Sequence, residues 1–297
     1  MGILTFTFFF IFALIIFIVV RDRTEITSNK EVVSSLTLNL LGFQSFRYIL
    51  GKTLYWLKLK TTKNFNLKEN ISSEVIKLGY AKKNNFLSKE EFLKIKQEYY
   101  QAIDEIKNKI KKGSNDDRRI KIDENTKEKY PSLYKLKDSV VIKNIFTNCE
   151  LKNNIQINCV IERIEIFDNT IYDFNRDFHY DTFYNTFKAW LFLDDVTEKK
   201  GPFHIIPESH KFSIKRLFSE YWFSILYSLK VFNKDSRADS KKKINLNKKS
   251  IKAEVSKNTL IVANTHGLHR RGDAENGSIR ESIHFWTREH PFKIFSK

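Results

Sequence analysis

The first residues that could carry chemistry are His179 and Asp181, which are separated by one residue in a chain of 297. At the end of a strand, alternate side chains point the same way, so an imidazole and a carboxylate at this spacing can reach one metal ion. A third ligand has to come from elsewhere, and a candidate strand over Thr259–Ala263 leads into His266 and His269. Two histidines and one carboxylate on one face of an octahedral ion leave positions open, as in non-haem iron(II) oxygenases.

A basic residue follows this group at a suggestive distance. Arg280 stands eleven residues after His269 and opens a second apolar run that ends at Trp286. A planar guanidinium that faces a metal site can bind a carboxylate through two hydrogen bonds, so it suits a dicarboxylate. Each signal is common by chance when taken alone. Taken together they favour one metal site, because the His-x-Asp pair, the distal histidine and the arginine follow in this order and each lies beside a candidate strand.

The elements that must position these residues are short apolar or β-branched runs in the second half of the chain. Turn residues separate these runs, which favours a jelly roll or sandwich over alternating strands and helices. The candidate strands are Cys159–Phe167, Ala189–Leu193, Phe203–Ile206, Thr259–Ala263 and Ser282–Trp286.

Helical sequence precedes the candidate strands. Ser88 and Glu91 form a capping box, and the apolar spacing after them predicts a long amphipathic helix that ends near Gly113. Charged, loop-like sequence continues from there to Pro131. The stretch Lys215–Lys252 interrupts the strands with an aromatic half and a lysine-rich half, and we interpret this insertion near 215–252 as a lid or a membrane-facing patch.

The chain begins with 18 consecutive uncharged residues, Ile3–Val20. A spanning helix needs about 20 such residues, so residues 1–22 are predicted to form a transmembrane anchor. Arg21 and Arg23 follow at once, which predicts a single-pass protein whose catalytic domain faces the cytoplasm. Residues 23–69 would be juxtamembrane, and Leu36–Leu59 reads equally well as a basic amphipathic helix on the membrane or as a helix that covers the domain.

Composition narrows the class of partner. The formal charge of +17 suits anionic lipid or nucleic acid, but no basic stripe alternates with aromatic residues, so no nucleic acid is expected. The 41% hydrophobic share is that of a foldable chain. Two cysteines, Cys149 and Cys159, offer neither zinc-ligand spacing nor a disulfide framework.

Several motifs in succession resemble the phytanoyl-CoA dioxygenase family of 2-oxoglutarate-dependent oxygenases, over roughly residues 70 to 292. The likeness starts at Gly79-Tyr80 and at the Ser-capped segment Leu87–Phe92. It is sharpest in the segments Phe178–Asp181, Lys188–Glu198, Gly201–Lys211 and His269–Gly272, which Arg280 follows.

This resemblance implies a mainly β fold with flanking helices, the double-stranded β-helix (jelly-roll, cupin-like), over residues 70–297. It implies that His179, Asp181 and His269 bind Fe(II), and that O2 is a co-reactant. By the same resemblance Arg280 binds the distal carboxylate of the cosubstrate 2-oxoglutarate, and Trp190 lines its pocket.

The chain also departs from the family pattern. Arg271 replaces a small hydroxyl residue, Glu208 stands where glycine is usual, and His266 competes with His269 as the third ligand, although the spacing to Arg280 favours His269. Halogenating relatives lack the carboxylate, so Asp181 favours hydroxylation. The remaining histidines are assigned structural or supporting roles: His204, His210 and His284.

The predicted function is therefore a membrane-bound dioxygenase that hydroxylates an unactivated C–H bond of a small, lipid-like or apolar substrate. Two alternatives stay open: an inactive cupin-like binding or scaffold protein, and a metal hydrolase or isomerase on the same fold. The substrate and the oligomeric state are left open.

Overall fold

A computed structural model describes residues 32–61, 71–105, 116–231 and 249–289. The predicted transmembrane anchor over residues 1–22 lies outside these ranges. Within them, no helix combines the length and hydropathy needed to cross a bilayer.

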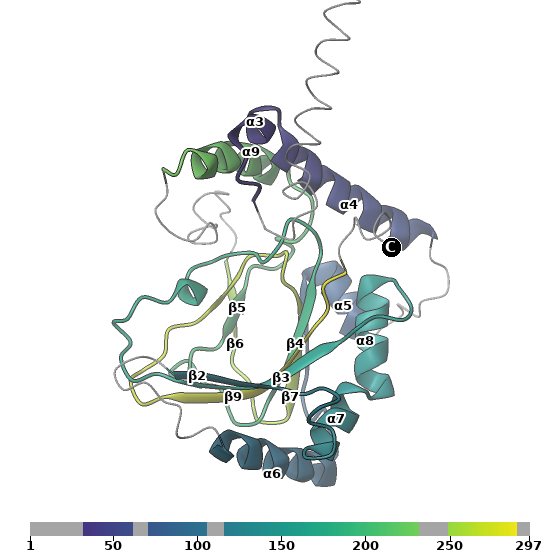
Figure 1. Cartoon of the computed structure of the whole chain (residues 1–297), viewed down its shortest axis with the longest axis vertical. Coiled ribbons are helices and arrows are strands. Elements are labelled where there is room, and N and C mark those ends of the chain that lie inside the picture. Colours follow the sequence, from purple (N-terminus) through teal and green to yellow (C-terminus); the bar gives the residue numbers. More distant parts are fainter. Residues whose placement is uncertain (1–31, 62–70, 106–115, 232–248, 290–297) are drawn as a thin grey trace, which may run out of the picture.

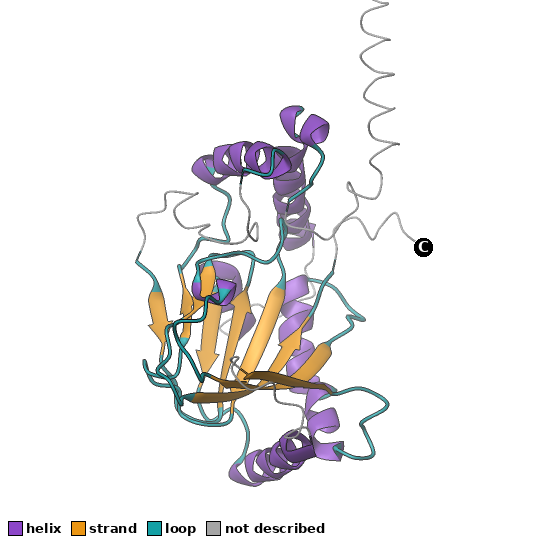
Figure 2. Ribbon diagram, turned by 60° about the vertical axis from the view of Figure 1, so that its left-hand side comes forward, coloured by secondary structure: helices purple, strands orange, loops and turns teal. Residues whose placement is uncertain are grey.

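The centre of the fold is a six-stranded antiparallel sheet (Figures 1 and 2). Its strands, in spatial order, are β1 (Tyr80–Lys83), β7 (Thr259–Asn264), β4 (Phe187–Phe192), β9 (Ile279–Trp286), β3 (Asn158–Glu165) and β2 (Asp116–Lys121). A three-stranded antiparallel sheet has the order β6 (Ile251–Ala253), β5 (Phe203–Ile205) and β8 (His269–Arg271). The prediction of a mainly β fold with flanking helices is confirmed.

Alternate residues of the larger sheet face two different environments. On the outer face, residues such as Leu191 and Phe285 pack in one core with four helices. These helices are α5 (Ile71–Leu78), α6 (Lys89–Glu105), α7 (Pro131–Lys137) and α8 (Val140–Glu150). On the inner face, Phe192 and Ile261 pack against Phe203 of the smaller sheet. The two sheets therefore enclose a second core between them.

Local signals explain two of the outer helices. The Ser88 hydroxyl donates to Glu91 at 2.7 Å, and the Glu91 amide donates back to Ser88, so the predicted capping box forms at the start of α6. The structure describes this helix as far as Glu105. Helix α8 forms despite three β-branched residues in its first turn, because Ser139 caps it and Ile142 and Phe146 are buried beneath it.

Strand β2 corrects the prediction of loop-like sequence between residues 113 and 131. It pairs with β3 over its whole length. Its sequence lacks an apolar alternation, and cross-strand charges take that place: Arg119 lies 2.7 Å from Glu162, and Arg118 lies 3.7 Å from Glu165. A strand stabilised by charge pairs lacks the alternating apolar residues from which a strand is normally predicted.

Three further helices form a cap over one end of the two sheets, at the top of Figure 1. They are α3 (Leu36–Leu40), α4 (Phe43–Thr61) and α9 (Ile214–Ser228). Asn39 of α3 donates to the Ser224 carbonyl of α9 at 3.0 Å, and Gln44 of α4 donates to Glu220 of α9 at 3.1 Å. The first half of the predicted insertion is thus a helix packed on the segment that was expected near the membrane.

Candidate metal centre

Two chain segments meet antiparallel at one end of the inner cavity. The amide of His179 donates to the carbonyl of His269 at 2.9 Å, and the amide of His269 donates back at the same distance. The amide of Asp181 donates to the Thr265 carbonyl at 3.0 Å. This pairing places the two histidines directly opposite each other, with the carboxylate on the same side two residues later.

The three side chains converge at this point. One ligand atom from each of His179, Asp181 and His269 can be chosen so that all lie within 4.8 Å of one another. The two imidazole centroids are 4.5 Å apart, and His269 Nε2 lies 3.9 Å from Asp181 Oδ2. Both histidines are buried.

Hydrogen bonds fix which ring nitrogens face the cluster. Nδ1 of His179 lies 2.7 Å from the Asp177 carbonyl, and Nδ1 of His269 lies 2.9 Å from the Gly267 carbonyl. A carbonyl only accepts, so each Nδ1 carries the proton and each Nε2 keeps its lone pair. Neutral imidazoles and one carboxylate are a donor set that fits iron(II).

The protonation states agree with this set. Burial, followed by the neighbouring His179, lowers the pKa of His269 to about 3. Burial alone would raise the pKa of Asp181, but Lys188 and the two imidazoles hold it well below its ordinary value. The cluster therefore presents a carboxylate and a neutral imidazole near neutral pH, which are the forms that bind metals.

Lys188 is a residue that the sequence reading left without a role. Its Nζ lies 2.8 Å from Asp181 Oδ2, and it extends from the inner face of β4 two residues before Trp190. A lysine is normally expected at the surface of a protein. However, alternate residues of a strand point the same way, so Lys188 could have been predicted to face the cavity together with Trp190.

The cluster opens into a cavity of about 420 Å³ between the sheets. Trp190 and Arg280 both line it, from β4 and β9. Arg280 Nη1 donates to the Gly201 carbonyl at 2.6 Å. Besides Arg280, five basic side chains line the cavity: Arg119, Lys188, Arg270, Arg271 and Arg288. They outnumber the two acidic residues, Glu162 and Asp181, so the cavity is suited to anions.

His284 is the inner-face residue that supports Trp190. Their rings stack with centroids 5.0 Å apart and planes inclined by 11°. Burial, followed by the charge of Lys188, lowers the pKa of His284 to about 3, so the ring is neutral. His210, by contrast, lies outside the cavity and contacts the Ile76 carbonyl at 2.9 Å.

His266, the alternative third ligand, points away from the cluster. It is fully buried, its Nδ1 lies 2.8 Å from the Thr182 carbonyl, and its ring packs against Tyr48 and Tyr180. The geometry therefore brings His269, and not His266, to His179 and Asp181.

The departures at Glu208 and Arg271 have structural explanations. Glu208 adopts a left-handed conformation with φ of 62°, where glycine is the least strained residue. Its amide donates to the Leu78 carbonyl at 2.8 Å, and its carboxylate pairs with Lys211. Arg271 lines the cavity and forms an ion pair with Asp173.

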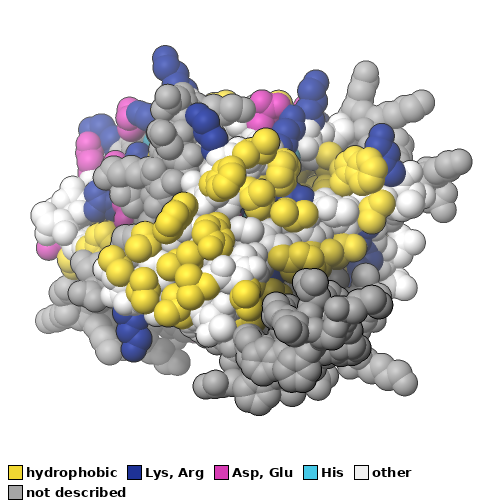
Figure 3. Space-filling model, turned by 90° about the horizontal axis from the view of Figure 1, so that it is seen from above, with side chains coloured by type: hydrophobic (Ala, Val, Ile, Leu, Met, Phe, Trp, Pro, Cys, Tyr) yellow, Lys and Arg dark blue, Asp and Glu magenta, His cyan; other side chains and the backbone are white. Residues whose placement is uncertain are grey.

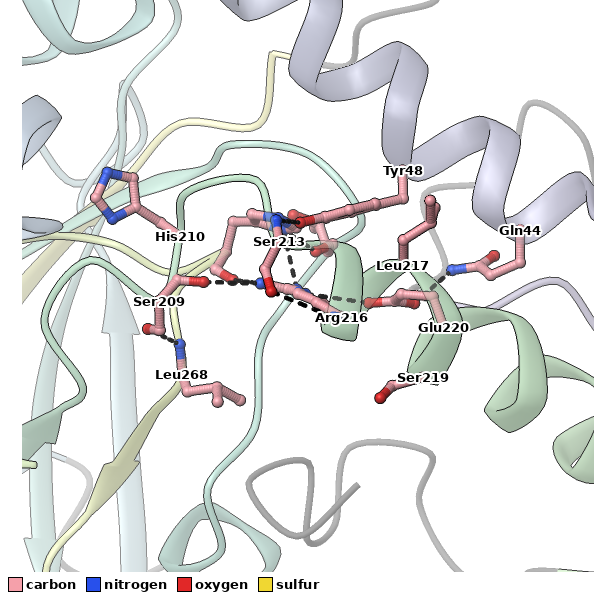
Figure 4. Close-up of polar contacts among 12 residues, drawn as sticks. Gln44, Tyr48, Ser209, His210, Ser213, Arg216, Leu217, Ser219, Glu220 and Leu268 are labelled. Atoms are coloured by element: carbon pink, nitrogen blue, oxygen red, sulfur yellow. Dashed lines mark hydrogen bonds and ion pairs between the residues drawn. The ribbon is translucent and has the colours of Figure 1, made fainter. Parts of the chain in front are cut away.

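A buried arginine in the cap holds the segment that ends in His269 (Figure 4). Arg216 of α9 donates through Nη1 to the Ser209 carbonyl at 3.2 Å and to the His266 carbonyl at 2.9 Å. Its Nε lies 3.3 Å from Glu220 Oε1, and both side chains are almost fully buried. Ser209 in turn accepts a 2.7 Å hydrogen bond from the Leu268 amide. The cap and the metal-site segment are thus directly bonded.

Comparisons with known proteins agree with this arrangement. The family model described as "Phytanoyl-CoA dioxygenase (PhyH)" matches residues 77–269. No curated protein sequence matches the chain.

Solved structures are similar to this chain, and that of EctD shares its fold. EctD from S. alaskensis, whose structure has bound Fe, is 12% identical with a TM-score of 0.52, and the alignment covers 76% of this chain and 78% of EctD. AviO1 from Streptomyces viridochromogenes is 14% identical with a TM-score of 0.48, over 74% of this chain and 94% of AviO1.

Proposed function

Because the chain belongs to the phytanoyl-CoA dioxygenase family and is a 2-oxoglutarate-dependent dioxygenase, we propose that it hydroxylates an unactivated C–H bond of a small, apolar or lipid-like substrate. Its cofactors are Fe(II), 2-oxoglutarate and O2. The observation that carries the site assignment is the convergence of His179, Asp181 and His269 within 4.8 Å. In this proposal these three residues hold the iron.

The proposed fold is the double-stranded β-helix. Two antiparallel sheets with a shared inner core, and a metal cluster where residue 179 pairs with residue 269, support it. In the same proposal residues 1–22 anchor the protein in a membrane, with the domain of residues 70–297 facing the cytoplasm. The uncharged run Ile3–Val20 and the arginines after it support this topology.

Each residue has a defined task in this proposal. The Asp177 and Gly267 carbonyls orient the two imidazoles by accepting their Nδ1 protons. Arg280 binds the distal carboxylate of 2-oxoglutarate, which its place on the cavity wall supports. Trp190 forms an apolar wall of the cosubstrate pocket.

Bound iron(II), together with 2-oxoglutarate and dioxygen, supplies the oxidising power to insert an oxygen atom into an unactivated C–H bond. The protein contributes the neutral imidazoles, the carboxylate and the side chains that line the cavity. The Lys188 ammonium lies 2.8 Å from Asp181, and this neighbour lowers the pKa of that carboxyl group, which keeps it ionised.

The cavity lining bears on the substrate. Aromatic and aliphatic side chains, among them Phe192 and Phe203, form part of the wall, while Arg119, Arg270 and Arg288 add positive charge beyond Arg280. We therefore favour, within the lipid-like class, an apolar substrate that carries an anionic group. The reason is that a cluster of positive charges around a cavity attracts an anionic group.

Anaerobic titration of the detergent-solubilised full chain tests the proposal. Iron(II) is added first and 2-oxoglutarate second, and the visible charge-transfer absorption of the chelate is recorded. We expect the band in the wild type, its loss in His269→Ala, and a band that needs far more 2-oxoglutarate in Arg280→Ala.

His266→Gln is the matched histidine control and should keep the band. Loss of the band in His266→Gln, with the band retained in His269→Ala, would overturn the ligand assignment. Iron binding without any 2-oxoglutarate band in the wild type would instead favour a hydrolase or isomerase. Binding of neither would favour a scaffold protein.

A further inference from the structure

The cap carries an unusual outer surface. Large apolar side chains on α3, α4 and α9, and on the residues beside them, are exposed and gather on one face of the molecule (Figure 3). We call this surface the cap face. Its members are Leu40, Leu41, Phe46, Ile49, Trp56, Leu57, Phe212, Ile214, Phe218, Trp222, Leu229 and Val231.

These residues follow the helical repeat, so they form continuous stripes. Phe46, Ile49 and Trp56 are three and seven residues apart along α4, and Ile214, Phe218 and Trp222 are four apart along α9. Trp56 is 54% exposed and Trp222 is 62% exposed. A contiguous apolar surface of this kind marks an interaction site on a soluble domain.

The opposite sides of the same helices are already used. Gln44, Arg47 and Tyr48 are buried beneath α4, and Arg216 and Glu220 are buried beneath α9 in the hydrogen-bonded network under the cap. The exposed stripes therefore cannot turn inward without breaking this network. Their exposure is a property of the folded cap.

The charges of the cap have one sign at the surface. Along α3, α4 and α9 as described, Glu220 is the sole acidic residue, and it is 2% exposed in its ion pair with Arg216. Lys60 and Lys215 are exposed, and Lys58 is half-buried. Apolar and aromatic side chains rimmed by lysine match the interface of an anionic bilayer, where basic residues meet the headgroups and aromatic rings sit among them.

The position of the cap agrees with this partner. The uncharged run ends at Val20, twelve residues before the first described residue, Val32. Twelve residues span at most about 40 Å when fully extended. The described chain then begins at the cap itself, since Val32 and Val33 lead into α3 and the Asn39 side chain donates to the Val33 carbonyl. A membrane-inserted run would therefore keep this end of the domain close to the bilayer.

A second cavity, of about 630 Å³, also reaches the cap face. Ile49, Trp56 and Phe212 belong both to its lining and to the exposed surface. Its lining is mainly apolar, with Lys52 and Asn185 joined by a 3.0 Å hydrogen bond on its wall. Such a cavity fits the acyl chain of a lipid better than a folded protein partner.

We propose that the cap face lies on the surface of an anionic lipid bilayer, with α4 and α9 inserted to the depth of the headgroups. This inference goes beyond the proposed oxygenase activity, and it assigns a role to the cap independently of the metal centre. The lysines around the cap face favour a lipid over a second copy of the chain, because two faces of the same positive charge would repel each other.

Tryptophan quenching tests the contact in the full chain. The protein is reconstituted in vesicles of phosphatidylcholine and phosphatidylglycerol, with or without phosphatidylcholine brominated near the top of the acyl chain. We expect the brominated lipid to quench the wild-type emission. Trp56→Phe and Trp222→Phe should each reduce the quenched fraction, and the double variant should remove most of it.

The matched control places an exposed tryptophan at the far end of the molecule. Leu93 is 56% exposed on α6, opposite the cap in Figure 1, and Leu93→Trp is added to the double variant. Its emission should not be quenched. Equal quenching of this residue would show non-specific adsorption and would overturn the proposal.

Charge variants test the headgroup preference. The combined replacement of Lys58, Lys60 and Lys215 by Gln should reduce quenching in anionic vesicles and bring it close to the level in pure phosphatidylcholine. Unquenched Trp56 and Trp222 would overturn the proposal. Emission that then varies with protein concentration would identify a second copy as the partner. None of these readouts depends on catalysis, so the oxygenase proposal stands or falls separately.

Discussion

The two faces of the larger sheet are built from alternate residues of the same strands, yet they hold opposite kinds of side chain. On β9 the inner positions are Arg280, Ser282 and His284, whereas the intervening Ile283 and Phe285 belong to the helix-covered core. On β4, Lys188 and Trp190 face the cavity. Around the metal cluster the inner face is largely polar and lines a cavity, whereas the outer face is largely apolar and covered by helices.

This difference teaches that chemistry and stability can be changed separately in this fold. Substitutions of the polar, cavity-lining residues of the inner face should alter binding and turnover with little effect on folding. Substitutions on the outer face should alter the free energy of unfolding with little effect on the folded enzyme. Residues of the same type on opposite faces provide the sharpest tests.

The largest effect is expected from His179→Ala. This change removes one of the three proposed ligands, so 2-oxoglutarate turnover, measured as succinate formation, should fall below detection. The fold should persist, because water can occupy the vacated space in a polar cavity. A Tm near the wild-type value together with retained turnover would remove His179 from the proposed ligand set.

Phe285→Ala tests the opposite face of the sheet. Phe285 is fully buried among the outer helices, so its truncation should lower the free energy of unfolding by about 3–5 kcal/mol. Denaturant titration measures this change. Val140→Ala, at a side chain that is 71% exposed, should stay within about 0.5 kcal/mol of the wild type. The folded fraction of Phe285→Ala should keep its affinity for 2-oxoglutarate.

The next largest effect is expected on 2-oxoglutarate affinity, and it compares Arg280 of β9 with Arg163 of the neighbouring strand β3. Arg280→Ala should weaken 2-oxoglutarate binding about ten- to a hundredfold, the value of one charge-assisted contact. Arg163 lies on the outer face and is 2.6 Å from Glu281, so Arg163→Ala should lower stability and leave that affinity unchanged. Titration of the charge-transfer band compares both variants. Equal losses of affinity would contradict the separation of the faces.

The smallest effect concerns the thiols. Cys149 and Cys159 are fully buried on the helix-covered side, and burial raises the pKa of both. Neither should react with a thiol reagent in the native protein, and both should react after denaturation. Val140→Cys should add one thiol that reacts at once. Fast native labelling of the wild type would show that the outer face opens readily.

The sequence was most informative where a strand is long and buried. The predicted strand Thr259–Ala263 is observed as β7 (Thr259–Asn264), and Ser282–Trp286 lies within β9. Strands β6 (Ile-Lys-Ala) and β8 (His-Arg-Arg) were missed because they hold too few apolar residues to form a run, whereas the equally short β5 (Phe-His-Ile) lies in an apolar run and was predicted. Helix α9 was not recognised, since its exposed aromatic stripe hides the amphipathic pattern.

The site shows the same limit. The spacing to Arg280 favoured His269, but His266 stayed an alternative, because the choice depends on which histidine the backbone of residue 179 pairs with. That pairing joins segments ninety residues apart and has no local signal. Lys188 was missed for a related reason: its neighbour Asp181 is reached only when β4 and the preceding turn are placed in space.

Arg216 gives the cap a mechanical consequence. One guanidinium is bonded both to Glu220 within α9 and to the carbonyls of Ser209 and His266, so a displacement of α9 has to break these bonds or carry the residues before His269 with it. The outer surface of α9 is therefore connected to the metal cluster through the hydrogen bonds of Arg216. Thermodynamic reciprocity follows: any factor by which contact at the cap changes metal affinity is the factor by which metal changes that contact.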